Sequence, residues 1–284
     1  IANFYSRRIK RLFPATFFTI IITLFFGTLI LTPGEFVELA KSAIYASAFL
    51  ANLWFANNSG YFDQATDISP LVHLWSLAVE EQYYLIVPIL YVVSYRFGGL
   101  SALRRLTVFV FITSLLLSVY YTELYANYSF YMLHTRMWEL AIGALLALYP
   151  LRKKISSSLA NLLSVSGFFL IASGLLVITE FIPYPGHYAL IPTLGTALII
   201  LSMSHQRALG FNFLASKPLQ FLGTISYSAY LWHWPIIVYY RIYKLEQPFS
   251  VAESMFLIIF SILAGYLSWR LVEEKFRYSQ LNFP

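Results

Sequence analysis

The sequence predicts an all-α membrane protein, a polytopic bundle of about eight spanning helices. Three observations predict this fold class: the composition, the length of the apolar segments and the distribution of the cations. Of the 284 residues, 59% are hydrophobic and 11% are charged, and the mean hydropathy is +0.67. Soluble domains carry about 25% charged residues, so the composition excludes a cytosolic enzyme, a nucleic-acid-binding module and a disordered segment. The absence of cysteine excludes disulfides and thiolate catalysis.

Eight segments are apolar over the roughly 20 residues that a helix needs to cross a bilayer core. They cover approximately residues 12–32, 74–95, 106–122, 133–150, 158–179, 188–204, 219–241 and 251–271. A ninth stretch, 36–56, is apolar in its middle but carries Glu38 and Lys41. We expect this stretch to form an amphipathic or re-entrant helix on the outer side of the membrane.

The cations predict the orientation of the chain. With the N-terminus in the cytoplasm and eight spans, 15 of the 19 Lys and Arg residues fall on the cytoplasmic side, as the positive-inside tendency requires. If 36–56 also crossed the membrane, the pair Arg104/Arg105 and the run Arg152, Lys153 and Lys154 would face outward. We therefore expect eight spans with both ends of the chain in the cytoplasm.

Polar residues inside the predicted spans are candidates for a functional site, because a charge at mid-bilayer costs from about 2.5 kcal/mol upward and needs a partner. Counted from the outer ends of their helices, they lie at one depth, so we expect one layer of acids, imidazoles and aromatics suited to acid–base chemistry. The catalytic candidates are His73, Glu80, Glu81, Glu139 and His233, and the structural or substrate-positioning candidates are Trp75, Ser76, Arg136, Tyr227, Tyr230 and Trp232.

These residues also have structural interpretations, which stay open at this stage. Arg136 and Glu139 are spaced i, i+3 and fit a structural ion pair. Either histidine fits a helix-packing role. Trp75 and Trp232 are typical of interfacial or packing aromatics.

A basic cluster precedes the first span, and it contains Arg8 and Arg11 on one helix face. Two guanidinium groups on one face match the oxygens of a phosphate. They predict a phosphate clamp at the cytoplasmic face, where nucleotide-bearing donors such as acyl-CoA reside. The alternative is a topology anchor or a contact with anionic lipids.

Five sequence motifs occur in a recognisable order. They are FYSRRIKRLFPA at 4–15, GYFD at 60–63, PLVHLWSLAVEEQYY at 70–84, RMWEL at 136–140 and ISYSAYLWHWP at 225–235. Together they resemble the integral-membrane acyltransferase family 3, and the resemblance covers nearly the whole chain.

The resemblance implies O-acylation, usually O-acetylation, of cell-envelope glycans such as the O-antigen of lipopolysaccharide. It implies acyl-CoA as the donor, Arg8 and Arg11 as the residues that bind its phosphates, and His73, Glu80 and Glu81 in the working core. It also implies a protein of the bacterial inner membrane, in contact with the bilayer and a glycan acceptor, without a metal and without nucleic acid.

Comparison with the family pattern adds further expectations. Members usually have two spans before the arginine motif, the first with the histidine thought to be catalytic, so we expect residues 1–284 to form a single membrane domain that is incomplete at its N-terminus and inactive alone. The pattern resembles members that carry an SGNH hydrolase-like domain after the membrane part, so we expect such a domain C-terminal to this segment in the full protein and no soluble domain within 1–284. Lys275 stands where relatives commonly have proline.

A second function fits the same layer of polar residues. Several helices around a polar centre are also typical of a transporter or flippase, here of a lipid-linked glycan. Transporters often contain internal repeats, and we find none in this sequence.

Overall fold

The computed structural model describes residues 2–58, 68–150, 155–179, 181–205 and 208–277 of the chain. Every regular element within these residues is helical, which confirms the all-α fold class. The chain divides into two compact units, one formed by Ile1–Glu81 with Phe221–Pro284 and the other by Gln82–Gln220.

The first unit is built around two long helices that run parallel, α1 (Ala2–Ile30) and α11 (Lys217–Tyr243). Thr16 of α1 meets Tyr227 of α11, and further along Thr23 meets Tyr239. Spacings of three and four residues place Thr16, Thr19 and Thr23 on the buried face of α1. The remaining elements of this unit are α2 (Pro33–Ser47), α3 (Ala51–Asn58), the first turns of α5 (Leu74–Leu124), α12 (Val251–Ser268), the π-helical turn η1 (Trp269–Glu273) and α13 (Glu274–Arg277).

The predicted outer helix over 36–56 is two helices in the structure. The first, α2, begins with a capping box in which Thr32 and Glu35 satisfy each other's backbone amides. It ends where Phe49 adopts a positive φ of 54°, and α3 follows. With 15 residues, α2 is about 22 Å long, which is shorter than the bilayer core of about 30 Å.

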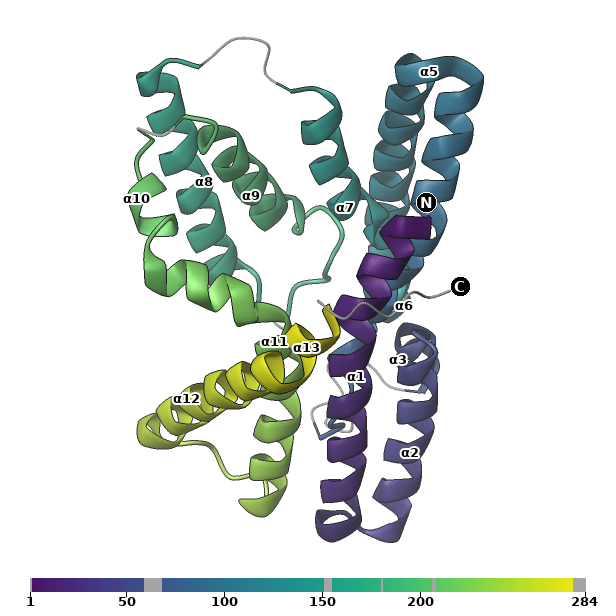
Figure 1. Ribbon diagram of the computed structural model, residues 1–284, viewed down its shortest axis with the longest axis vertical. Coiled ribbons are helices and arrows are strands. Elements are labelled where there is room, and N and C mark those ends of the chain that lie inside the picture. The colour runs from purple at the N-terminus through teal and green to yellow at the C-terminus, as the bar shows by residue number, and fades with distance from the viewer. Residues whose placement is uncertain (1, 59–67, 151–154, 180, 206–207, 278–284) are drawn as a thin grey trace. The chain divides into compact units, whose positions relative to one another are not determined.

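The second unit contains the remainder of α5, which bends at Gly98 and Gly99. Gly99 has a φ of 58°, a conformation that glycine adopts without a steric penalty. The bend folds α5 into a hairpin of two helices (Figure 1), so the structure confirms two separate helices for the segments 74–95 and 106–122. The other elements of this unit are α6 (Ala126–Tyr131), α7 (Leu133–Leu148), α8 (Ser157–Val177), α9 (Leu190–Ser202) and α10 (Phe211–Leu214).

Helices α8 and α9 lie side by side (Figure 1) and approach closely at a pair of glycines. A Cβ atom added to Gly167 would lie 2.7 Å from the carbonyl oxygen of Gly195, and one added to Gly195 would lie 2.9 Å from the carbonyl oxygen of Gly167. Small residues at such contacts are typical of helix packing in membranes, where close van der Waals contact drives association.

Four of the described helices are long and apolar enough to cross a membrane: Ala2–Ile30, Leu74–Leu124, Ser157–Val177 and Val251–Arg277. The bend in α5 divides the second of these into two arms. Helix α9 is apolar but shorter, with 13 residues. The count of eight passes and the orientation of the termini therefore stay predictions.

Candidate functional site

Both arginines of the predicted clamp pair with carboxylates. The Arg8 Nε atom lies 3.3 Å from Glu81 Oε1, and the Arg11 Nε atom lies 3.8 Å from Glu273 Oε1. Glu273 is fully buried, and its Oε2 atom accepts a hydrogen bond of 2.8 Å from Ser228 Oγ. A buried carboxylate needs such partners because its desolvation is costly, so the hydrogen bond from Ser228 helps to hold the carboxylate that faces Arg11.

The contact between Arg8 and Glu81 corrects the predicted depth of the acids. The expected arrangement separated a cytoplasmic clamp from an outer layer that held Glu80 and Glu81. In the structure the segment before α5 enters the unit, because Leu71, Val72 and His73 are all buried. Helix α5 therefore begins within the bundle, and a further seven residues, about 10 Å of helix, bring Glu81 to Arg8.

The two acids of the second motif differ in their surroundings. The Glu81 side chain is 13% exposed and faces Arg8, whereas Glu80 is exposed. Adjacent residues of a helix point about 100° apart, which accounts for the difference.

Further polar side chains lie along α11, beginning at Tyr227, which meets α1 one turn beyond Arg8. Tyr227 Oη donates to Leu12 O at 2.9 Å and lies 2.5 Å from Thr16 Oγ1. One turn further, Tyr230 Oη lies 2.6 Å from Ser76 Oγ. The next turn carries His233, whose ring centroid is 5.6 Å from that of His73. We call the set Glu81, Tyr227, Ser76, Tyr230, His73 and His233 the polar column; it replaces the predicted single layer.

Hydrogen bonding indicates which nitrogen of each imidazole carries the proton when the ring is neutral. His73 Nε2 lies 3.2 Å from the carbonyl oxygen of Leu231, and a carbonyl only accepts, so Nε2 carries the proton. His73 Nδ1 is then the acceptor nitrogen, and it is buried with no hydrogen-bond partner among the described residues. His233 Nδ1 bonds in the same way to Tyr230 O, which makes its Nε2 atom the acceptor. Each ring therefore presents one basic nitrogen, as proton transfer requires.

The aromatic candidates surround the polar column in different ways. Trp232 packs edge-on against Phe18 with ring centroids 5.9 Å apart. Its Nε1 atom is buried without a hydrogen-bond partner among the described residues. Trp75 is half-buried at the start of α5. Trp234, which was not among the predicted site residues, donates from Nε1 to Ser69 O at 2.9 Å and so ties the segment before His73 to α11.

Arg136 and Glu139 form the predicted ion pair within the second unit. Arg136 Nε lies 3.0 Å from Glu139 Oε1, and the guanidinium lies 5.4 Å from the ring centroids of Phe130 and Tyr184. Glu139 lines a cavity of about 280 Å³ between α7 and α9. These contacts support a structural role for the pair. That the pair lies at the same membrane depth as the other predicted site residues stays a prediction.

Sequence reasoning missed Glu273 as a partner of the arginine motif. A signal was present, because an acid closing an 18-residue apolar helix is costly to bury unless it has a partner. The motif Gly60–Asp63 and the cations Arg152, Lys153, Lys154 and Arg207 lie outside the described residues. Among the residues that the structure describes, no group of three His, Asp or Glu side chains is arranged to hold a metal ion.

Comparison with known proteins identifies the family. The model of acyltransferase family 3, described as an acyltransferase domain, matches residues 1–270. An O-acetyltransferase OatA of Staphylococcus aureus is 31% identical over 290 aligned residues, covering 98% of this chain and 47% of the relative. The peptidoglycan O-acetyltransferase OatA of Listeria monocytogenes is 29% identical, covering 98% of this chain and 46% of the relative. An uncharacterized protein of Haemophilus influenzae is 34% identical over 214 residues, covering 72% of this chain and 87% of the relative.

The chain thus spans about half the length of the OatA relatives it matches. No solved structure gives a significant match. Because the family model extends over nearly all of the sequence, the chain belongs to acyltransferase family 3.

Proposed function

We propose that this protein transfers an acyl group, by resemblance an acetyl group, from cytoplasmic acyl-CoA to a hydroxyl of a cell-envelope glycan at the bacterial inner membrane. The observation that carries this proposal is the polar column. It begins at Glu81, which pairs with Arg8, one of two arginines suited to a phosphate-bearing donor, and it ends at two imidazoles that each present a basic nitrogen when neutral. Membership of the acyltransferase family supports it over a transporter or flippase.

Arg8 and Arg11 are proposed to bind the phosphates of the donor. Each guanidinium faces a carboxylate in the structure, and a phosphate has the same forked acceptor geometry. Donor phosphate would compete with Glu81 for Arg8, and binding would free the Glu81 carboxylate from its ion pair.

The imidazoles are proposed to move the proton of the acceptor hydroxyl. The hydroxyl oxygen bonds to the thioester carbonyl carbon, the carbon–sulfur bond breaks, and CoA leaves as a thiolate. His73 Nδ1 or His233 Nε2 accepts the hydroxyl proton and delivers it to the thiolate. Tyr230, which donates to His73 O and contacts Ser76, positions the start of α5 for this step.

The acceptor is proposed to be an envelope glycan, and two kinds of glycan are candidates. The motifs resemble enzymes that act on O-antigen, whereas the Listeria relative is described as a peptidoglycan O-acetyltransferase. The proposed chemistry is the same for both, because each glycan offers sugar hydroxyls.

The donor assignment is tested with the double variant Arg8→Ala/Arg11→Ala in the full-length protein. We expect glycan acetylation to be lost at unchanged protein level, and each single variant to raise the KM for acetyl-CoA about tenfold or more. Arg7→Ala is the matched control, because Arg7 is exposed on the same turn of α1 and carries the same charge. Normal acetylation in the double variant would overturn the donor assignment.

A second experiment separates the transferase from a transporter. Purified protein in proteoliposomes is supplied with labelled acetyl-CoA and a glycan acceptor. A transferase produces label covalently bound to the glycan, whereas a flippase moves the glycan across the bilayer without acetyl-CoA. Glycan movement without labelling would replace the proposed function with the transporter.

A further inference from the structure

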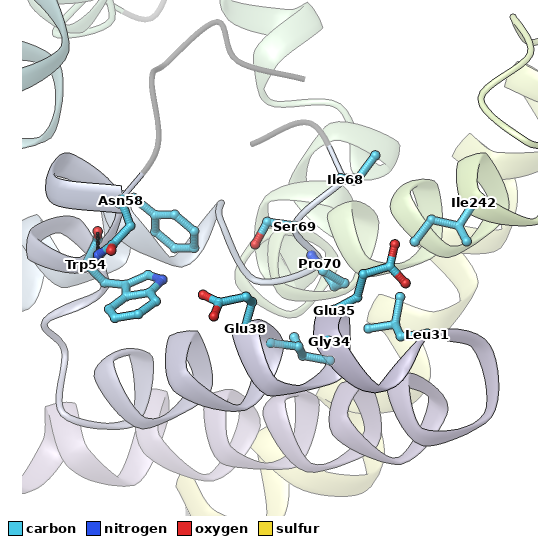
Figure 2. Close-up of a pocket in the computed structure, with 12 residues that line it drawn as sticks. Leu31, Gly34, Glu35, Glu38, Trp54, Asn58, Ile68, Ser69, Pro70 and Ile242 are labelled. Atoms are coloured by element: carbon cyan, nitrogen blue, oxygen red, sulfur yellow. Dashed lines mark hydrogen bonds between the residues drawn. The ribbon is translucent and has the colours of Figure 1, made fainter. Parts of the chain in front are cut away.

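A pocket of about 410 Å³ lies in the first unit beside the C-terminal end of α1. Its walls come from the segment after α1, from α2 and α3, and from residues 68–70, with Ile242 of α11 closing one side. Figure 2 shows the Glu38 carboxylate between the indole of Trp54 and Ser69, whereas the Glu35 carboxylate points towards Ile242. The volume falls within the roughly 300–1,000 Å³ typical of small-molecule sites.

The pocket combines an aromatic wall with carboxylates. Trp54 is half-buried and packs against Tyr45 with ring centroids 4.9 Å apart. Glu38 Oε1 pairs with Lys41 at 2.7 Å, and Glu35 Oε2 accepts from Thr32 N at 2.8 Å. Each of these bonds uses one oxygen of its carboxylate, and carboxylate oxygens accept hydrogen bonds from hydroxyl groups.

This chemistry favours a saccharide over a phosphorylated ligand. A sugar presents a C–H face that packs on an indole, and around that face it presents hydroxyl donors that carboxylates accept. Two acids in one pocket repel a phosphate, because like charges brought together raise the free energy of binding. The donor CoA therefore does not fit this pocket, whereas a neutral polyol does.

The pocket lies at the end of α1 opposite the arginines, where the proposed reaction needs its acceptor. Arg8 and Leu31, which lines the pocket, are 23 positions apart along α1, about 35 Å of helix. That length is close to the bilayer core of about 30 Å. Ser69 and Pro70, in the pocket wall, lead within four residues to His73. A ligand in the pocket would thus lie opposite the arginines and next to the segment that carries an imidazole.

We infer that this pocket binds the acceptor saccharide, with Trp54 stacking on the sugar ring and Glu38 accepting its hydroxyls. The inference rests on the proposed function and adds an acceptor site to it. The inference also favours a saccharide acceptor over a hydroxyl group of a protein. A sugar ring can stack on the indole of Trp54, whereas a protein hydroxyl does not need a stacking surface.

The test measures saccharide binding and acetyl transfer separately on the purified full-length protein. The probe is a tetramer of N-acetylglucosamine, titrated by calorimetry. We expect Trp54→Ala and Glu38→Gln each to weaken its binding about five- to tenfold, and Trp54→Phe to retain most of it. In transfer assays the same variants should raise the KM for the tetramer and leave the KM for acetyl-CoA unchanged. Glu246→Gln, at an exposed acid outside the pocket, is the matched control.

The outcomes separate this inference from the proposed function. If the wild type does not bind the tetramer, or if Trp54→Ala and Glu38→Gln bind it as the wild type does, the acceptor pocket is wrong. Transfer to a protein serine that neither substitution affects would also overturn it. If acetyl-CoA is never turned over while saccharide binding depends on Trp54, the pocket stands and the transferase fails. Glu38→Gln preserves side-chain volume, so it remains informative if Trp54→Ala does not fold.

Discussion

Gly265→Ala tests the close packing of α12 on α11, the helix that carries Tyr230 and His233. A Cβ atom at position 265 would lie 2.5 Å from Ala229 Cα, 2.7 Å from Ala229 N and 2.8 Å from Ala229 Cβ. Favourable contacts between carbon atoms begin near 3.5 Å. Two of the three clashing atoms belong to the backbone and cannot rotate away, so the helices must separate by about 1 Å.

The expected effect on stability follows from two opposing contributions. Overpacking of this kind costs about 1–3 kcal/mol, and replacing a helical glycine by alanine returns roughly 0.5–1 kcal/mol. We expect a net loss of about 1–2 kcal/mol in the free energy of unfolding, or a fall of roughly 2–8 °C in the apparent Tm. Acetyl transfer should also fall, because Ala229 directly precedes Tyr230 in the polar column.

Thermal unfolding of the purified protein in detergent measures this effect. Gly223→Ala is the matched control, since it makes the same substitution on α11 with no atom within 4 Å of the new Cβ. The control should match or exceed the wild type in Tm. A Gly265→Ala protein as stable as Gly223→Ala would refute the packing between α11 and α12.

Two further predictions concern single side chains. Arg104 donates from Nε and Nη2 to Leu148 O, at 3.0 and 2.8 Å, where α7 ends. Arg104→Ala should therefore lower the free energy of unfolding by about 1.5–3 kcal/mol, as measured by thermal unfolding. Arg105→Ala, at the exposed neighbouring residue, should leave it unchanged. Glu273→Gln keeps the shape of the buried side chain but removes the charge that faces Arg11. Steady-state kinetics should therefore show a changed KM for acetyl-CoA with little change in the KM for the acceptor. An unaltered KM for acetyl-CoA would show that Glu273 has no part in donor binding.

Features that depend on neighbouring residues were predictable from the sequence. The spacing of Arg136 and Glu139 placed them on one helix face, and they pair as expected. The segments 74–95 and 106–122 were predicted as separate helices, and the chain turns between them. Glu80 and Glu81 are adjacent on a helix, so their side chains point about 100° apart, and their surroundings differ. These features follow from helix periodicity or from the length of an apolar segment, so predicting them needs no contact between distant parts of the chain.

Contacts between distant segments were not predictable in this way. The depth of each polar group was counted from the end of an apolar segment, which assumes that helices start at the membrane surface. Helix α5 starts inside its unit instead, and Glu81 therefore meets Arg8, 73 residues away. The same holds for Ser228 and Glu273, which are 45 residues apart.

By itself, then, the sequence determined the helical class, the apolar character, most helix locations and the motifs of the family, because these follow from composition and from local periodicity. The tertiary structure alone decided which acid faces which arginine, which nitrogen of His73 and His233 is basic, and that the polar residues of the first unit form a column. The physical reason is that buried charges and imidazoles take their properties from partners, and those partners come from helices that only the packed chain brings together.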